Sequence, residues 1–200
     1  MNTPAWVPGN ESKPAPGSLL RVQALVNTRD LDSGTDLLED ATTARAWLRA
    51  VGLLGSRTSL DDEELQQVRA VRESLRTLLA HNAGDPRPSA TDLRALDELT
   101  RQVRPRLELD RDGRLLLGSE PGGRVRERLL GLLLEVRDAQ ADGTWSRLKA
   151  CGNPGCRWAF YDRSHSRRGA WCDMAACGNK IKNRNLRARK GARGACTLTG

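Results

Sequence analysis

The spacing of apolar residues predicts helices along the first part of the chain. Residues 19–30 form a short, mostly apolar segment that we interpret as a first helix. Between residues 36 and 52, apolar side chains recur every three or four positions, which places them on one helical face. Residues 60–82 show this spacing most clearly, and Ser59 with Asp62 resembles a capping box at their start. These segments therefore predict three helices.

The pattern predicts two further helices before residue 144. Ser89 or Thr91 can cap a fourth helix, whose apolar residues again recur at intervals of three and four. A Leu-rich segment opens at Ser119 and Pro121 and stops near Gly143, and we interpret it as a fifth helix.

A β-hairpin is predicted between the fourth and fifth helices. Residues 105–118 alternate between apolar and polar around Asp112-Gly113. A two-residue Asp-Gly turn between alternating runs favours a hairpin. The predicted fold class is therefore mainly α with one small β-hairpin, and the predicted helical domain spans residues 19–143.

The composition of the first residues and the length of the apolar runs bear on location. Residues 1–18 are rich in Pro, Gly and Ser and lack the charged-then-apolar pattern of a signal peptide, so we expect a disordered leader. No run of about 18 apolar residues occurs, and we expect no membrane partner. The expected location is cytoplasmic, where thiols stay reduced and disulfides are rare.

Positive charge is concentrated in the last quarter of the chain. The net charge is +8. Residues 145–200 hold 13 Lys+Arg and 2 Asp+Glu, a net charge of +11, whereas residues 1–144 hold 20 and 23, a net charge of −3. A basic block on a slightly acidic protein indicates a polyanionic partner. The alternative is a basic tail that only increases solubility.

Four of the five cysteines form two closely spaced pairs. Four residues separate Cys151 from Cys156, and four separate Cys172 from Cys177. Two such pairs can supply the four thiolates of a tetrahedral zinc site, whereas buried or redox-active cysteines would leave the pairing unexplained. We therefore predict one structural Zn²⁺ bound by all four. Four thiolates leave no position for a substrate water, so this zinc would stabilise the fold.

The other candidate ligands are weaker. His165 lies in a basic loop, where a solvated histidine is the simpler interpretation. Cys196 has no partner, and we expect a free thiol in a flexible tail at residues 191–200. Cys172 and Cys177 lie about 140° apart on an ideal helix, so we expect Cys172 in a turn and Cys177 near a helix start.

The cysteine region resembles the C-terminal signature of the CGNR zinc-finger proteins. The resemblance rests on Trp171-Cys172, Met174 and Cys177-Gly178-Asn179-Lys180, preceded by Cys151, Cys156-Arg157-Trp158, Phe160, Asp162 and Ser164. Upstream, ALVNTRD at 24–30, DLLEDATTARAWLRAVGLL at 36–54 and VRAVRESLRTLLAHNAG at 68–84 resemble the helical ABATE domain that precedes this finger. The resemblance implies a treble-clef-like zinc knuckle over residues 145–190, DNA binding by the finger, and a regulatory helical domain in a stress-linked bacterial transcription regulator.

Two positions depart from the family pattern. Lys180 stands where the family usually has Arg, and Gly169-Ala170 stand where it tends to have Arg. Lysine keeps the charge but lacks the two-pronged hydrogen bonding of a guanidinium. If the family arginines contact phosphates or bases, this chain should bind more weakly or with altered specificity.

A basic helix after Cys177 would present the DNA-contacting side chains. Phosphate contacts are expected from Lys180, Lys182, Arg184, Arg187, Arg189 and Lys190. Asn179 and Asn183 lie four apart and are candidates for base readout, because Asn can pair with adenine; a capping role is the alternative for Asn179. Arg163, Arg167 and Arg168, between the cysteine pairs, would flank the DNA backbone or form a solvated loop.

The helical domain is expected to dimerise or to sense a small-molecule effector. Asn27, Thr28 and Trp47 are the candidate ligand residues, with helix capping and core packing as their alternatives. The favoured function is a DNA-binding transcription regulator. An RNA-binding protein and a zinc-stapled protein-interaction module stay as alternatives. We expect no enzyme, because the sequence offers neither a Ser/His/Asp set nor a phosphate-binding glycine loop.

Overall fold

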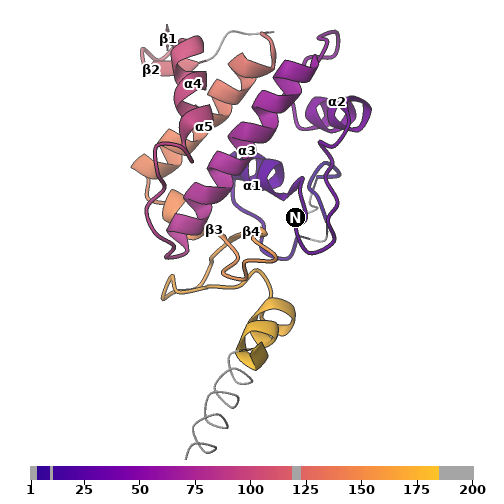
Figure 1. The fold of residues 1–200 in the computed structure, drawn as a ribbon. Helices are drawn as coiled ribbons and strands as arrows, with labels where there is room; N and C mark the ends of the chain where they lie inside the picture. Colours follow the sequence, from indigo (N-terminus) through magenta and orange to yellow (C-terminus); the bar gives the residue numbers. More distant parts are fainter. Residues whose placement is uncertain (1–3, 10, 119–122, 185–200) are drawn as a thin grey trace, which may run out of the picture.

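Helices are the predominant regular elements of the structure (Figure 1). The computed structural model describes residues 4–9, 11–118 and 123–184. The helices are α1 (Leu19–Asn27), α2 (Ala41–Ala50), α3 (Asp62–Asn82), α4 (Arg94–Gln102) and α5 (Val125–Ala141), followed by a 3₁₀ turn, η1 (Trp145–Arg147), and a π-helical turn, η2 (Met174–Gly178). The predicted mainly α fold is confirmed. The predicted start of the fifth helix at Ser119 and Pro121 lies outside the described residues, and α5 is described from Val125 onward.

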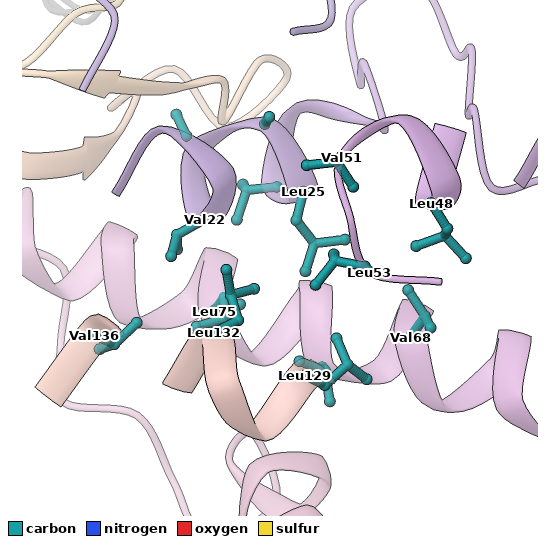
Figure 2. Close-up of a cluster of buried hydrophobic side chains, with 14 of the residues drawn as sticks. Val22, Leu25, Leu48, Val51, Leu53, Val68, Leu75, Leu129, Leu132 and Val136 are labelled. Carbon is teal, nitrogen blue, oxygen red and sulfur yellow. The ribbon is translucent and has the colours of Figure 1, made fainter. Parts of the chain in front are cut away.

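α3 lies at the centre of the hydrophobic core. Its buried face runs through Val68, Leu75 and Leu79 at helical spacing. α1 and α5 both pack on this helix and on each other. Figure 2 shows side chains of α1, such as Val22, and of α5, such as Leu132, converging on α3. The apolar stripes of the sequence therefore form one shared core.

α3 begins with a capping box, two residues later than predicted. The carboxylate of Asp61 accepts a hydrogen bond from the Glu64 N–H at 2.8 Å, and the Glu64 carboxylate accepts one from the Asp61 N–H at 3.2 Å. The expected pair of Ser59 and Asp62 is therefore wrong. Carboxylates suit this position because the N-terminus of a helix carries partial positive charge.

α2 is shorter than the predicted helix over residues 36–52. It begins at Ala41, where the Asp40 carboxylate accepts hydrogen bonds from two backbone N–H groups. The preceding residues close a turn: Asp36 pairs with Arg29 in a β-bridge, and its carboxylate binds the buried Arg72 at 2.6 Å. Asp36 therefore belongs to this turn, and the helix starts only after Asp40.

The predicted hairpin is present, but its turn has three residues instead of two. β1 (Arg106–Leu109) pairs antiparallel with β2 (Leu115–Gly118). The Asp110 N–H donates to the Arg114 carbonyl at 3.0 Å, so residues 111–113 form the turn. Gly113 has φ +75°, the left-handed conformation that closes such a three-residue turn.

A second two-stranded sheet was not predicted. β3 (Leu148–Ala150) pairs antiparallel with β4 (Ala159–Tyr161), and every residue of both strands is buried. β3 packs against α3. Three-residue strands are too short to show alternation in a sequence, and full burial removes the alternation altogether.

The expected disordered leader at residues 1–18 is wrong for residues 4–9 and 11–18, which pack on both parts of the molecule. The Trp6 carbonyl accepts a hydrogen bond from the Trp47 indole at 2.7 Å. The Glu11 carboxylate accepts hydrogen bonds from Asn27 and from the Trp158 indole. Gly9, at φ +65°, lies against Trp158, where a Cβ would come within 3.1 Å of the ring. The low-complexity composition conceals these contacts because backbone carbonyls supply several of them.

Among the described residues, no helix has both the length and the apolar character needed to cross a membrane.

Candidate metal centre

The first cysteine pair lies in the turn between β3 and β4. Cys151 follows β3 directly, and its N–H donates to the Trp158 carbonyl at 2.9 Å. This bond adds one backbone hydrogen bond to those that pair β3 with β4. The N–H groups of Cys156 and Arg157 both donate to the Asn153 carbonyl. Arg157 has φ +50°, which turns the chain back toward β4. The Gly-Asn-Pro-Gly segment thus forms the tight turn that its composition predicts.

The second pair lies at the start of the terminal helix, which we define as residues 179–184, continuing from η2. Cys172 lies in a bend, and Cys177 lies inside η2. The Asp173 carboxylate caps this turn by accepting a hydrogen bond from the Ala176 N–H at 2.7 Å. This placement confirms the inference that Cys172 occupies a turn and Cys177 the start of a helix.

The four sulfur atoms form one cluster with zinc-like spacing. All four lie within 4.8 Å of one another. The sulfur of Cys172 lies 3.7 Å from that of Cys156 and 3.8 Å from that of Cys177. Tetrahedral zinc with bonds of about 2.3 Å requires sulfur–sulfur distances of roughly 3.8 Å, whereas a disulfide requires about 2.05 Å. The cluster fits one Zn²⁺ bound by four cysteines.

Thiol crowding changes the acidity of three of these cysteines. Hydrogen bonds from Cys156 and Cys172 lower the pKa of Cys151. The hydrogen bond to Cys151 raises the pKa of Cys156, and hydrogen bonds to Cys151 and Cys156 raise the pKa of Cys172. Ionisation of neighbouring thiols brings like charges together, and a bound dication such as Zn²⁺ would offset this repulsion.

Asn153 supports the cluster in a way that the sequence did not indicate. Its side-chain N–H donates toward the Cys177 sulfur at 3.7 Å, and its side-chain oxygen accepts from the Gly155 N–H at 3.2 Å. It thereby links the first cysteine turn to a ligand of the second. His165, by contrast, is exposed and lies outside the described ligand cluster. Cys196 lies outside the described residues.

A buried ion pair orders the loop between the cysteine pairs. The Lys149 ammonium lies 2.8 Å from the Asp162 carboxylate and also donates to the Arg167 carbonyl at 2.6 Å. Asp162 further accepts hydrogen bonds from Ser164 and from the Gly169 N–H. Burial raises the pKa of Asp162, but the hydrogen bonds from Lys149, Ser164 and Gly169 outweigh it and hold the pKa below its usual range.

The predicted DNA-contacting residues that the structure describes lie on the lobe that holds the four cysteines. Asn179, Lys180, Lys182, Asn183 and Arg184 are exposed on the terminal helix, which projects from the far end of the molecule (Figure 1). The loop residues Arg163, Arg167 and Arg168 are exposed as well. Arg187, Arg189 and Lys190 lie outside the described residues. The role of these side chains stays a prediction.

Several contacts join the lobe that holds the four cysteines to the helical domain formed by α1–α5. Lys180 pairs with Asp32 in the loop after α1 at 3.2 Å, and this contact raises the pKa of Lys180. Arg157 pairs with Asp85 at 2.7 Å. The nearly buried Arg76 of α3 donates to the carbonyls of Val26 and Arg157. The two lobes are therefore joined by polar contacts from the first cysteine turn and from the terminal helix.

The three candidate effector residues already have partners within the chain. The Asn27 side chain pairs with both the N–H and the carbonyl of Ala159 on β4. The Thr28 hydroxyl donates to the Leu25 carbonyl and accepts from Arg72. The Trp47 indole N–H donates to the carbonyl of Trp6 in the leader. An effector at these residues would have to replace such contacts, and their ligand role stays a prediction.

Two known family models together match most of the chain. Residues 21–143 match the ABATE family, described as "Putative stress-induced transcription regulator", and residues 147–190 match the CGNR zinc finger. No curated protein matches the sequence. The first match covers more than half of the chain, and the second covers the four-cysteine cluster. The chain therefore belongs to the ABATE family and carries a C-terminal CGNR zinc finger.

Proposed function

We propose that this protein is a cytoplasmic, non-enzymatic transcription regulator whose zinc finger binds DNA. The observation that carries the proposal is the terminal helix. It continues directly from η2, which contains the ligand Cys177, and it presents Lys180, Lys182 and Arg184 to solvent. A helix of this size fits the major groove, which is about 12 Å wide. The basic loop at residues 163–168 lies in the same lobe and adds positive charge.

The side chains divide into two roles. Lys182 and Arg184 would contact phosphates and fix the register of the helix on DNA. Asn183 and Asn179, both exposed, would read base edges. Zinc holds the two cysteine turns together, so the helix leaves the lobe in a fixed direction. The helical domain would supply dimerisation or effector sensing.

DNA is favoured over RNA by the position of the aromatic residues. Recognition of single-stranded RNA relies on exposed aromatic rings that stack on bases. Phe160 and Tyr161 are buried in the structure, and Trp158 is half-buried against the leader. The aromatic residues of the finger are therefore used for packing.

The test is DNA binding by the zinc-loaded chain at several salt concentrations. The double variant Lys182→Ala/Arg184→Ala removes two phosphate contacts, so the slope of log affinity against log salt should fall by about 0.9 for each. Affinity should fall about equally for all DNA sequences. The control is Arg101→Ala/Arg137→Ala, which removes two exposed arginines from the helical domain.

Two results would reject the proposal. One is wild-type protein that shows no salt-dependent DNA binding. The other is an equal loss of binding in the control and in the finger variant. A loss confined to one DNA sequence would instead assign Lys182 or Arg184 to base readout.

A further inference from the structure

The β1–β2 hairpin exposes a leucine-rich face. Leu107 and Leu109 lie opposite Leu117 and Leu115, and directly paired residues point to the same side of a sheet. These four side chains are between 37% and 70% exposed. A contiguous apolar patch of this kind on a surface usually marks an interaction site. The hairpin lies at the end of the helical bundle away from the zinc finger (Figure 1).

The outer edge of β1 directs peptide groups away from the hairpin. Residues 110 and 114 form a hydrogen-bonded pair, and such pairs alternate along an antiparallel ladder. Glu108 and Arg106 are therefore the next residues bonded to β2. The N–H and carbonyl groups of Leu107 and Leu109 then point outward. Within the described residues this sheet consists of β1 and β2 only.

We propose that the hairpin is a homodimerisation surface, in which β1 pairs antiparallel with β1 of a second copy about a two-fold axis at Leu107. Leu107 would exchange both backbone hydrogen bonds with its equivalent, and the Leu109 N–H would donate to the Pro105 carbonyl of the second copy. The two leucine faces would join into one. The proposal rests on the dimerisation role proposed above, and it does not depend on DNA binding.

The charge pattern of β1 selects both the partner and the register. The outward peptide groups allow axes at Leu107, at Glu108, at Leu109 or at Arg106, and the last would bring the two copies of Arg106 face to face. With the axis at Leu107, Arg106 faces Glu108 of the second copy on both sides of the axis, and Arg104 faces Asp110. With the axis at Glu108, two glutamates face each other, and with the axis at Leu109, Glu108 faces Asp110. Directly opposed like charges destabilise a strand pair, so only the first register is complementary.

A two-fold interface uses the same surface on both partners, and this strand is complementary to itself. Basic residues precede Leu107 and acidic residues follow it in the segment Arg104-Pro105-Arg106-Leu107-Glu108-Leu109-Asp110. Pairing at this end of the bundle leaves both zinc fingers open to DNA. Because β1 has only four residues, the interface is small, and we expect a dimer that dissociates on dilution.

The first test measures the mass of the zinc-loaded chain in solution, without DNA, over a range of protein concentrations. The expected mass rises from 22.0 kDa toward twice that value. Arg106→Glu or Glu108→Arg alone should raise the dissociation constant at least about tenfold, because each brings like charges together twice per dimer. The double swap Arg106→Glu/Glu108→Arg restores opposite charges and should restore the dimer. Arg137→Glu, on the exposed side of α5, is the control, and circular dichroism reports whether each variant is folded.

The second test checks the register by cross-linking. In a Cys196→Ser background, Leu107→Cys places two thiols across the axis, where paired Cα atoms lie about 5.5 Å apart, within disulfide range. Leu109→Cys is equally exposed, at 70% against 66%, and is the matched control. Its two copies would be more than about 12 Å apart. Mild oxidation should cross-link the Leu107 variant alone.

Three results would overturn the proposal: a chain that is monomeric at every concentration, a double swap that does not recover the dimer, or cross-linking at residue 109 that equals or exceeds that at residue 107. If DNA binding fails while these tests succeed, the dimer surface stands and the proposed function falls. If DNA binding succeeds while these tests fail, only the dimer surface is rejected.

Discussion

Asn153 shows how one side chain can link the two halves of a metal site. It comes from the first cysteine turn, is buried, and donates a hydrogen bond toward the sulfur of Cys177 in the second. A hydrogen bond to a thiolate stabilises its negative charge without using a coordination position. Groups that orient metal ligands in this way strongly affect metal affinity.

We expect Asn153→Ala to weaken zinc binding by about 10- to 100-fold, because the Cys177 sulfur loses a donor and the turn loses the bond to Gly155. Competition with a zinc chelator measures the affinity. Asn183→Ala, which removes an exposed asparagine of the terminal helix, is the control and should leave zinc affinity unchanged. Equal affinities for the Asn153 variant and the wild type would show that this contact has no part in metal binding.

At the scale of elements, a buried ion pair anchors the basic loop at residues 163–168. Lys149 of β3 and Asp162 are 6% and 4% exposed, and between them they bind both ends of the loop. Removing one partner of a buried pair leaves the other charge without compensation. The exposed arginines of the loop therefore depend on the buried contacts of Lys149 and Asp162 for their position.

Asp162→Asn should reduce the free energy of unfolding by about 3–5 kcal/mol at neutral pH, as measured by urea denaturation of the zinc-loaded protein. The pKa of Asp162 lies below its usual range in the folded state. The stabilisation is therefore fully present above the unfolded pKa of about 3.9 and is lost as the pH falls through the folded value. The difference between variant and wild type should shrink over that acidic range. A loss below about 1 kcal/mol at neutral pH would mean that the pair does not hold the loop.

The sequence predicted elements well where a long apolar stripe defines them, as in α3. It also predicted the cysteine cluster, because ligand spacing is a local property. It missed β3 and β4, which are too short and too buried to alternate. It also missed Lys149 with Asp162 and Asn153 with Cys177, since these partners lie 13 and 24 residues apart with no pattern between them. Elements that depend on partners distant in sequence are not visible in a local pattern.

At the scale of the whole molecule, the zinc finger is part of the helical core. Leu148 and Tyr161 of the finger's sheet belong to the same hydrophobic cluster as the helices, whereas Cys151, Cys156 and Cys177 form a second, separate cluster. The leader crosses between the two: Lys13 donates to the Trp171 carbonyl, and its own carbonyl accepts from Tyr161. The boundary therefore lies within the finger: β3 and β4 belong to the helical core, whereas the two cysteine turns and the terminal helix form the metal-dependent part.

This arrangement predicts a graded response to loss of zinc. Cys177→Ser removes one of four ligands, so the cluster around Cys151 and the terminal helix should lose their structure. The helical core should remain folded at 25 °C, because its hydrophobic cluster contains no cysteine. It should nonetheless melt at a lower temperature than the wild type, since β3 and β4 are bridged by the metal turn and Asn27 is anchored on β4. Thermal melting followed by far-ultraviolet circular dichroism, with and without chelator, measures this shift.

Cys196→Ser is the matched control and should melt as the wild type does. Two independent lobes would instead give an unchanged melting temperature for the helices, and that result would contradict a shared core.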